Sequence, residues 1–277
     1  MTELNKNLVS TTFNFNAATT LFDWTNAYAC AMASHLAYCD ENKIAAQIKG
    51  VWGIEQFQFI ENKETQAFVM STDKLVLVAF RGTESNKIKD WVTDLKMKLI
   101  AGPFNGKVHH GFNSGIDLVW AQVKETISKL GFPEKSLWFT GHSLGAALAA
   151  LAAARVRAEN LPVQGLYTFG QPRTGDSTFA KNFDIEMNGK AFRFVNNNDI
   201  VPRIPPALPF RYHHLGVLRY FDVLGNYKSK MGFFNTFMDH VLGRIADFGD
   251  LGTDGVKDHS MENYLRLVKA QTDQKKD

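Results

Sequence analysis

The sequence predicts a single α/β domain in which a mostly parallel central sheet is flanked by helices. Strand-like and helix-like segments alternate along the chain, which implies crossover connections between parallel strands. The 277 residues, 45% of them hydrophobic, can bury one large core, and single α/β domains commonly reach this length. We therefore expect one domain over residues 1–277, with a helical lid or cap inserted at about 226–257.

The predicted elements begin with an Ala-rich helix over 24–39. Strands over 53–60 and 66–72 lead to the apolar run LVLVAF at 75–80, which indicates a buried strand. Apolar residues between Phe112 and Leu130 recur at helical spacing, and Gly131 supplies a stop signal. We expect the remaining elements to be a strand at 136–140, a small-residue helix at 144–159, strands at 165–170 and 191–197 separated by a polar helical stretch, and a helix starting near Met261.

Composition excludes several classes of protein. A formal net charge of +3 gives no support to a nucleic acid partner. The polar, Asn/Thr-rich first 21 residues resemble no signal peptide, so we expect a cytoplasmic protein, with peripheral membrane contact left open. The sequence contains no run of about 18 apolar residues, so it predicts no membrane-spanning helix. Cys30 and Cys39 have no CxxC spacing, and we assign them no chemistry.

Residues 141–145 (GHSLG) match G-x-S-x-G between a predicted strand and a predicted helix. A sharp strand-to-helix turn brings backbone close to the serine, and glycine two positions to either side avoids Cβ collisions. Ser143 would then stand at a helix N-terminus, whose partial positive charge favours a developing anion. We interpret Ser143 as the nucleophile of an α/β-hydrolase. The alternative is an ordinary Gly-rich turn in which the serine caps a helix.

A serine nucleophile needs a base and an acid that orients the base, and in α/β-hydrolases they follow in the order Ser, Asp or Glu, His. The histidines after Ser143 are His213, His214, His240 and His259. We favour His259, which lies in a loop just before a helix. Asp199 follows a strand, at the edge where sites gather, although an Asx turn explains it equally well. Asp258 is the rival acid, but as the neighbour of His259 we expect it to point elsewhere.

The oxyanion formed during ester cleavage requires two backbone N–H donors. One comes from the residue after the nucleophile, Leu144, and the other from the loop after an earlier strand. In that loop we nominate the N–H of Thr83, with its hydroxyl as a second donor. This chemistry requires no metal and no organic cofactor.

Eight motifs in family order resemble the fungal-type class 3 lipases. They are FRGT (80–83), DWVTDL (90–95), VHHGF (108–112), GHSLG (141–145), TFGQPR (168–173), NDIVPRIPP (198–206), YHHLG (212–216) and DHSMENY (258–264). The resemblance implies an α/β-hydrolase fold with Ser143 as nucleophile, Asp199 as acid and His259 as base. It also implies Thr83 as an oxyanion donor. The family positions His109, His142 and His214 are expected to be structural.

Two segments leave alternatives open. Residues 226–257 are longer and more aromatic than in compact members of that family, and either a core helix or a membrane-touching cap fits the pattern. Residues 84–98 correspond to the family's lid. Their apolar face and nearby lysines also fit a fixed core helix with a solvated side.

The expected function is hydrolysis of carboxylic esters through an acyl-enzyme. The resemblance favours a lipase acting on acylglycerol or polar-lipid esters, the latter including phospholipids and galactolipids. An esterase for soluble short-chain or aromatic esters is the main alternative. A non-catalytic lipid-binding protein ranks third, because the catalytic set is complete. Head group, chain length and oligomeric state are not encoded in any pattern that we identified.

Overall fold

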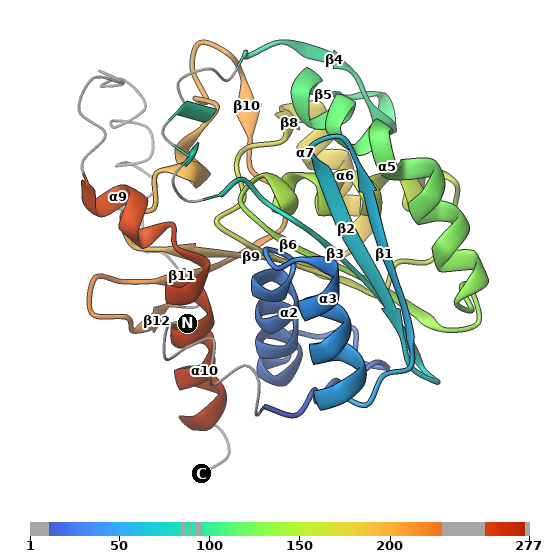
Figure 1. The fold of residues 1–277 in the computed structure, drawn as a ribbon. Helices are drawn as coiled ribbons and strands as arrows, with labels where there is room; N and C mark the ends of the chain where they lie inside the picture. Colours follow the sequence, from blue (N-terminus) through green and yellow to red (C-terminus); the bar gives the residue numbers. More distant parts are fainter. Residues whose placement is uncertain (1–10, 85–86, 89, 92–95, 229–252, 275–277) are drawn as a thin grey trace.

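The computed structural model describes residues 11–84, 87–88, 90–91, 96–228 and 253–274. An eight-stranded sheet crosses the molecule with helices on both faces (Figure 1). In spatial order its strands are β1 (Gln56–Asn62), β2 (Thr65–Ser71), β3 (Leu75–Phe80), β6 (Ser136–His142), β7 (Gly165–Phe169), β9 (Ala191–Asn196), β11 (Val217–Phe221) and β12 (Tyr227–Lys228).

The central strands of this sheet are parallel, as the alternation of elements predicted. β3, β6, β7, β9 and β11 pair with one another in parallel. At one edge β1, β2 and β3 form an antiparallel meander, and β12 is antiparallel at the other edge. The turn at 63–64 between β1 and β2 is too short for a crossover, which forces the antiparallel pairing.

Two helical layers cover the sheet. α5 (His110–Lys129), α6 (Leu144–Ala158) and α7 (Ser177–Met187) lie on one face, and α2 (Trp24–Leu36) and α10 (Met261–Gln274) lie on the other (Figure 1). Seven of the eight alanines of α6, all except Ala158, are fully buried. Their small side chains let α6 approach the sheet closely, so the helix gives firm support to the turn before it.

Each face of the sheet has its own hydrophobic core, and β3 contributes to both. Val76, Val78 and Phe80 face the α5–α6 side, whereas the intervening residues Leu75, Leu77 and Ala79 face the α2–α10 side. A strand buried on both faces is expected to be apolar at every position. This explains the unbroken run LVLVAF.

Smaller elements complete the described chain. They are α3 (Glu41–Ala45), the π-helical η1 (Ala46–Val51), the 3-10 turns η3 (Pro103–Asn105) and η4 (Val201–Arg203), α9 (Thr253–Asp258), and a small antiparallel sheet in the order β10 (Tyr212–His213), β8 (Gly175–Asp176), β5 (Lys107–His109), β4 (Leu99–Ala101). Strands of two or three residues are too short for a sequence pattern to indicate.

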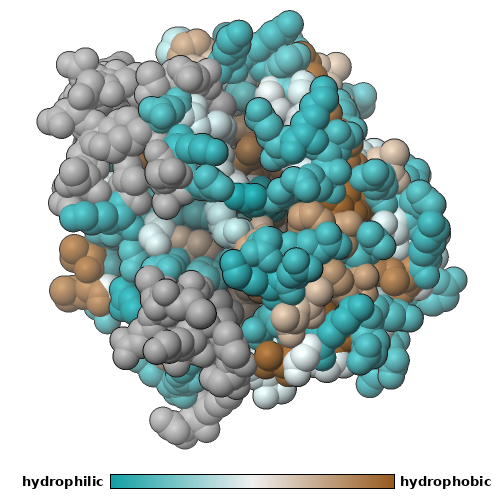
Figure 2. All heavy atoms as spheres, in the orientation of Figure 1, coloured by the Kyte–Doolittle hydropathy of each residue, from teal (hydrophilic) through white to brown (hydrophobic). Residues whose placement is uncertain are grey.

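Most side chains on the face of the molecule seen in Figure 2 are hydrophilic, and hydrophobic ones gather mainly over β1 and β2. Within the described ranges, no helix combines the length and apolarity needed to cross a membrane. Of the two segments considered as lids, most of 226–257 lies outside the described residues. Within 84–98 the undescribed residues are 85–86, 89 and 92–95.

Candidate active site

Ser143 occupies the sharp turn between β6 and α6. Its backbone has φ 58° and ψ −129°, a left-handed conformation that is strained for any residue other than glycine. A Cβ atom at Gly141 would lie 2.3 Å from the carbonyl oxygen of Gly145, and one at Gly145 would lie 2.3 Å from that of Phe80. Glycine is therefore required at both positions because backbone atoms approach closely there. The G-x-S-x-G motif predicted this reason. The Ser143 N–H donates to the carbonyl of Phe169 in β7 at 3.0 Å.

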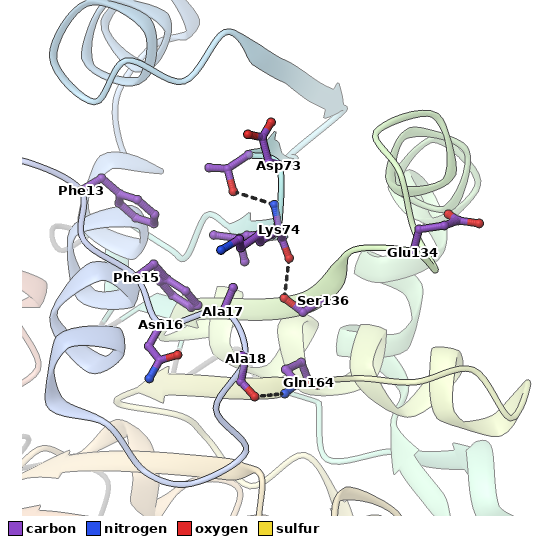
Figure 3. A pocket seen from close by; sticks show the side chains of 12 residues that line it. Phe13, Phe15, Asn16, Ala17, Ala18, Asp73, Lys74, Glu134, Ser136 and Gln164 are labelled. Carbon is purple, nitrogen blue, oxygen red and sulfur yellow. Dashed lines mark hydrogen bonds between the residues drawn. The ribbon is translucent and has the colours of Figure 1, made fainter.

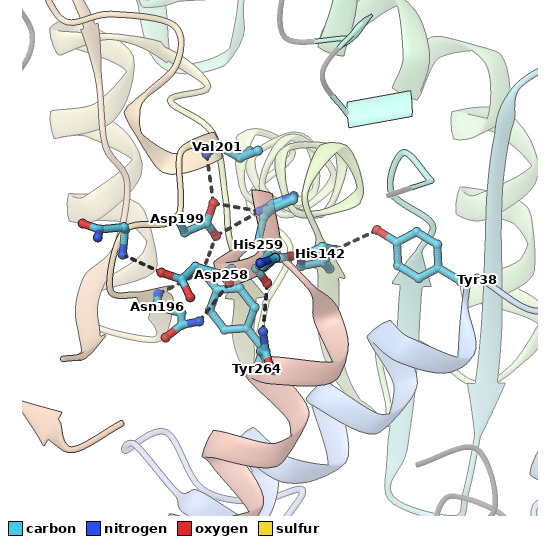
Figure 4. A network of polar contacts seen from close by, with 11 residues as sticks. Tyr38, His142, Asn196, Asp199, Val201, Asp258, His259 and Tyr264 are labelled. Carbon is cyan, nitrogen blue, oxygen red and sulfur yellow. Dashed lines mark hydrogen bonds and ion pairs between the residues drawn. The ribbon is translucent and has the colours of Figure 1, made fainter. Parts of the chain in front are cut away.

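The structure brings Asp199 and His259 together although they are 60 residues apart. Nδ1 of His259 lies 2.9 Å from each carboxylate oxygen of Asp199, and both side chains are buried (Figure 4). A carboxylate can only accept in this contact, so the hydrogen of the imidazole resides on Nδ1. The other ring nitrogen, Nε2, is left as a proton acceptor. This is the arrangement of a general base oriented by an acid.

Further donors hold the Asp199 carboxylate in place. The Val201 N–H donates to Oδ1 at 2.9 Å, and the Tyr264 hydroxyl donates to Oδ2 at 2.5 Å. The Tyr264 oxygen accepts in turn from the N–H of Asn196 at 3.0 Å. Burial, together with the Asp199 carboxylate, raises the pKa of Tyr264 well above its ordinary value, which keeps the hydroxyl protonated as a donor. The sequence analysis assigned no role to Tyr264, although this residue ends the motif DHSMENY (258–264) that contains His259.

Asp258 points away from the imidazole, as expected from its position beside His259. Its Oδ2 accepts hydrogen bonds from Nδ2 of Asn197 at 3.0 Å and from the N–H of Asn198 at 3.2 Å. Nδ2 of Asn196 donates to the Asp258 carbonyl at 2.9 Å. These bonds join the loop after β9, which carries Asp199, to the segment that carries His259.

Ser143 follows β6 and His259 lies in the turn between α9 and α10, and both adjoin the end of β7. A Cβ atom at Gly170 would lie 2.7 Å from Cε1 of His259, and Gly170 directly follows Phe169, whose carbonyl holds the Ser143 N–H. Within the described residues, Oγ of Ser143 and Nε2 of His259 are both buried and have no hydrogen-bond partner. They are therefore not hydrogen-bonded to one another here. Such contacts are often long before substrate binds.

The loop after β3 packs directly on the turn that carries Ser143. A Cβ atom at Gly82 would lie 2.3 Å from the carbonyl oxygen of His142 and 3.1 Å from Cβ of Ser143. Thr83, the next residue, is thereby placed beside the turn. Leu144 is the first residue of α6, so its N–H has no acceptor within the helix. The two nominated oxyanion donors therefore flank the serine.

A cavity of about 410 Å³ opens beside this constellation, and its walls include Tyr38, Thr83, His142 and His259. A larger cavity of about 840 Å³ lies at the opposite, amino-terminal ends of β3, β6 and β7, lined by Lys74, Ser136 and Gln164 among others (Figure 3). None of the site residues predicted from the sequence lines the larger cavity. Thr83 and His259 line the smaller cavity, which is therefore the candidate substrate site.

The other histidines are placed as follows. His109 caps α5, its Nδ1 accepting from the N–H of Phe112 at 3.2 Å, and burial lowers the pKa of His109 to about 4. Burial also lowers the pKa of His214 well below its ordinary value. Among the candidate bases, His213 is exposed, whereas His240 lies outside the described residues.

A central parallel sheet, a strained serine at a strand-to-helix turn and an Asp–His pair beyond the next strands together define an α/β-hydrolase. Comparison with known proteins agrees with this class. The family model described as Lipase (class 3) matches residues 77–208. Over this segment the chain is similar to the class 3 lipases.

Individual relatives are similar over part or most of the chain. A secreted mono- and diacylglycerol lipase of Fusarium solani is 37% identical over 148 residues, covering 51% of this chain and 42% of the relative. A triacylglycerol lipase of Arabidopsis thaliana is 31% identical over 255 residues, covering 71% and 49%. The solved triacylglyceride lipase of Rhizomucor miehei superimposes with a TM-score of 0.61 at 26% identity, covering 83% of this chain and 94% of that one. The chain spans about half the length of the curated relatives that it matches.

The expectation of a cytoplasmic protein is contradicted by these comparisons. The Fusarium solani relative is named as a secreted lipase, which points to an extracellular location. The expectation rested on the absence of a recognisable leader in the first 21 residues, a pattern that is weak support for any location.

Proposed function

We propose that this chain hydrolyses carboxylic esters of lipids, with Ser143 as nucleophile, His259 as base and Asp199 as the acid that orients the base. The observation that carries the proposal is the contact of His259 Nδ1 with both Asp199 oxygens at 2.9 Å. This contact leaves Nε2 free to accept a proton beside the strained serine turn. No described side chain other than Asp199 holds the His259 ring in this way.

In the proposed reaction, Oγ of Ser143 attacks the ester carbonyl carbon while Nε2 of His259 accepts its proton. The carbonyl oxygen becomes an oxyanion, which accepts hydrogen bonds from the N–H groups of Thr83 and Leu144. The proton on His259 passes to the leaving alcohol oxygen as the carbon–oxygen bond breaks, giving an acyl-enzyme. Water, deprotonated by His259, then releases the fatty acid and restores Ser143.

The proposed substrates are acylglycerols or polar-lipid esters such as phospholipids and galactolipids. The names of the Fusarium and Arabidopsis relatives support acylglycerols. Contact with a lipid surface is supported by Leu208 and Phe210, whose side chains are 59% and 42% exposed in the loop between η4 and β10. This loop begins only a few residues after Asp199, near the candidate site.

We propose that the chain acts as one domain, in which the described residues Ile88 and Trp91 pack beside the site. Ile88 is 2% exposed and packs against Val201 and Ile204, which follow Asp199 closely. Trp91 stacks on Phe112 of α5, with the ring centroids 6.1 Å apart. This packing fits both a closed lid and a fixed core helix, and a rise in turnover at vesicles would distinguish the lid.

The decisive experiment compares the wild-type chain with Ser143→Ala on a panel of p-nitrophenyl esters and on vesicles of defined lipids. We expect the variant to lose turnover by on the order of 10⁶-fold while remaining folded. Ser136→Ala, at the other end of β6, is the matched control and should keep its activity. Substantial hydrolysis by the Ser143 variant would refute the assignment.

The same panel tests the two alternatives. An esterase for soluble esters would cleave short-chain substrates with no gain at vesicles. A non-catalytic lipid-binding protein would cleave none of them, and its Ser143 would not react with a fluorophosphonate probe.

A further inference from the structure

A chain of hydrogen bonds reaches His259 from the side opposite Asp199. The Tyr38 hydroxyl lies 2.7 Å from Nδ1 of His142, and Nε2 of His142 lies 2.7 Å from the main-chain carbonyl oxygen of His259 (Figure 4). Tyr38 follows the end of α2, and His142 is the last residue of β6, directly before the nucleophile. The three residues therefore connect α2, the nucleophile turn and the start of α10.

The direction of each bond in this chain is determined. A carbonyl oxygen can only accept, so the hydrogen of the His142 ring resides on Nε2. Burial and the neighbouring His259 ring lower the pKa of His142 well below its ordinary value, so the ring is neutral and Nδ1 carries a lone pair. Burial raises the pKa of the Tyr38 hydroxyl, which therefore keeps its proton and donates it to Nδ1. Tyr38 and the His259 carbonyl oxygen thus select the same tautomer of His142 from opposite sides of the ring.

His142 also limits where the base can lie. Its ring stacks on that of His259 with the centroids 4.4 Å apart and the planes 30° apart. The side chain of His259 is held by Asp199, whereas its backbone is held by His142. Loss of the Nε2–H tautomer of His142 would place a ring lone pair against the lone pairs of the His259 carbonyl, and repulsion would displace the base.

The Tyr38 hydroxyl contacts the oxyanion loop as well. A Cβ atom at Gly82 would lie 2.3 Å from the Tyr38 hydroxyl oxygen. This oxygen therefore packs against the backbone that leads to Thr83. One hydroxyl group is therefore in contact with the loop that carries a nominated oxyanion donor and with the histidine that holds the base.

We propose that Tyr38, acting through the tautomer of His142, is a positioning residue for the base His259. The proposal rests on the proposed ester hydrolase function. Tyr38 transfers no proton to substrate in this scheme. It fixes the geometry in which Nε2 of His259 meets Oγ of Ser143, and misplacement of such a group is costly to the rate.

Tyr38→Phe removes the donor and keeps the aromatic ring. We expect kcat/KM to fall about tenfold, mostly through kcat, because a buried acceptor loses its partner and the base is less well held. In ¹H–¹⁵N spectra of histidine-labelled protein, wild-type His142 should appear as the neutral Nε2–H tautomer, and the variant should lose this single state. Tyr28→Phe, the same change on α2 at a half-buried tyrosine away from the site, should alter neither readout.

A double-mutant cycle with His142→Phe tests whether Tyr38 acts through His142. If it does, adding Tyr38→Phe to His142→Phe should change kcat/KM by less than about twofold, whereas independent effects would multiply. An active wild type whose Tyr38→Phe variant keeps both full kcat and the His142 tautomer would overturn the inference. A wild-type chain that cleaves no ester would instead refute the proposed function, so the two failures are distinguishable.

Discussion

Adding one methyl group at Gly82 should disable the site while leaving the fold in place. The new Cβ would lie 2.3 Å from the His142 carbonyl oxygen, whereas real Cβ atoms essentially never come within 3.0 Å of another heavy atom, so the groups must separate by at least 0.7 Å. The carbonyl belongs to the turn that carries Ser143, and the new Cβ would also lie 2.3 Å from the Tyr38 hydroxyl oxygen. The oxyanion loop must therefore move away from Ser143. A misplacement of about 1 Å in an active site costs about 10²-fold in rate.

We therefore expect Gly82→Ala to lower kcat/KM on p-nitrophenyl esters by about 10²-fold, with a loss of about 1–3 kcal/mol in the free energy of unfolding. Gly50→Ala is the matched control, because a Cβ there meets no atom within 4 Å and its φ is not in the left-handed region. That control should be as active as the wild type and slightly more stable. Equal kcat/KM for the two folded variants would refute the steric reasoning.

Three further predictions follow from the site and its surroundings. Asp199→Asn should lower kcat by on the order of 10⁴-fold, whereas Asp258→Asn should stay within about tenfold of the wild type, and the reverse order in steady-state assays would show that the acid is misassigned. Tyr264→Phe should reduce the free energy of unfolding in urea by about 1–3 kcal/mol, since it leaves the Asn196 N–H without its acceptor and removes a donor from Asp199; an unchanged unfolding midpoint would contradict that. His109 has a folded-state pKa of about 4 against an ordinary value of 6.5, so below pH 6.5 the unfolded chain binds a proton that the folded chain does not. Stability should therefore fall as pH drops from 6.5 to 4, by up to about 3 kcal/mol from this residue. His109→Asn, which keeps an acceptor to cap α5, should flatten that slope in urea titrations at several pH values.

The parts of the fold that the sequence predicted are those in which burial is continuous. LVLVAF was identifiable as a strand because β3 is covered on both faces, and α6 was identifiable because its alanines lie against the sheet. β11 was not predicted, since it lies near the sheet edge and four of its five residues are incompletely buried. Its partner in the sheet is set by tertiary packing, which no local pattern encodes.

At the site, the sequence could name chemical groups but not their contacts. Asp199 was equally consistent with an Asx turn and with a catalytic acid. In the structure its Oδ1 accepts from the Val201 N–H, as in an Asx turn, and also contacts Nδ1 of His259. Tyr38 and Tyr264 escaped prediction because their significance lies in hydrogen bonds to residues 104 and 65 positions away. Only the folded chain reveals such partners.

The left-handed backbone at residue 143 lowers the stability of the fold at the residue on which the proposed reaction depends. Holding a side chain at φ 58° and ψ −129° costs about 1–3 kcal/mol, and glycine alone would adopt this conformation without strain. A laboratory selection for heat resistance without a screen for turnover would therefore favour replacement of the nucleophile itself. Attempts to improve the durability of this protein should hold position 143 constant and seek their gains in the surrounding framework.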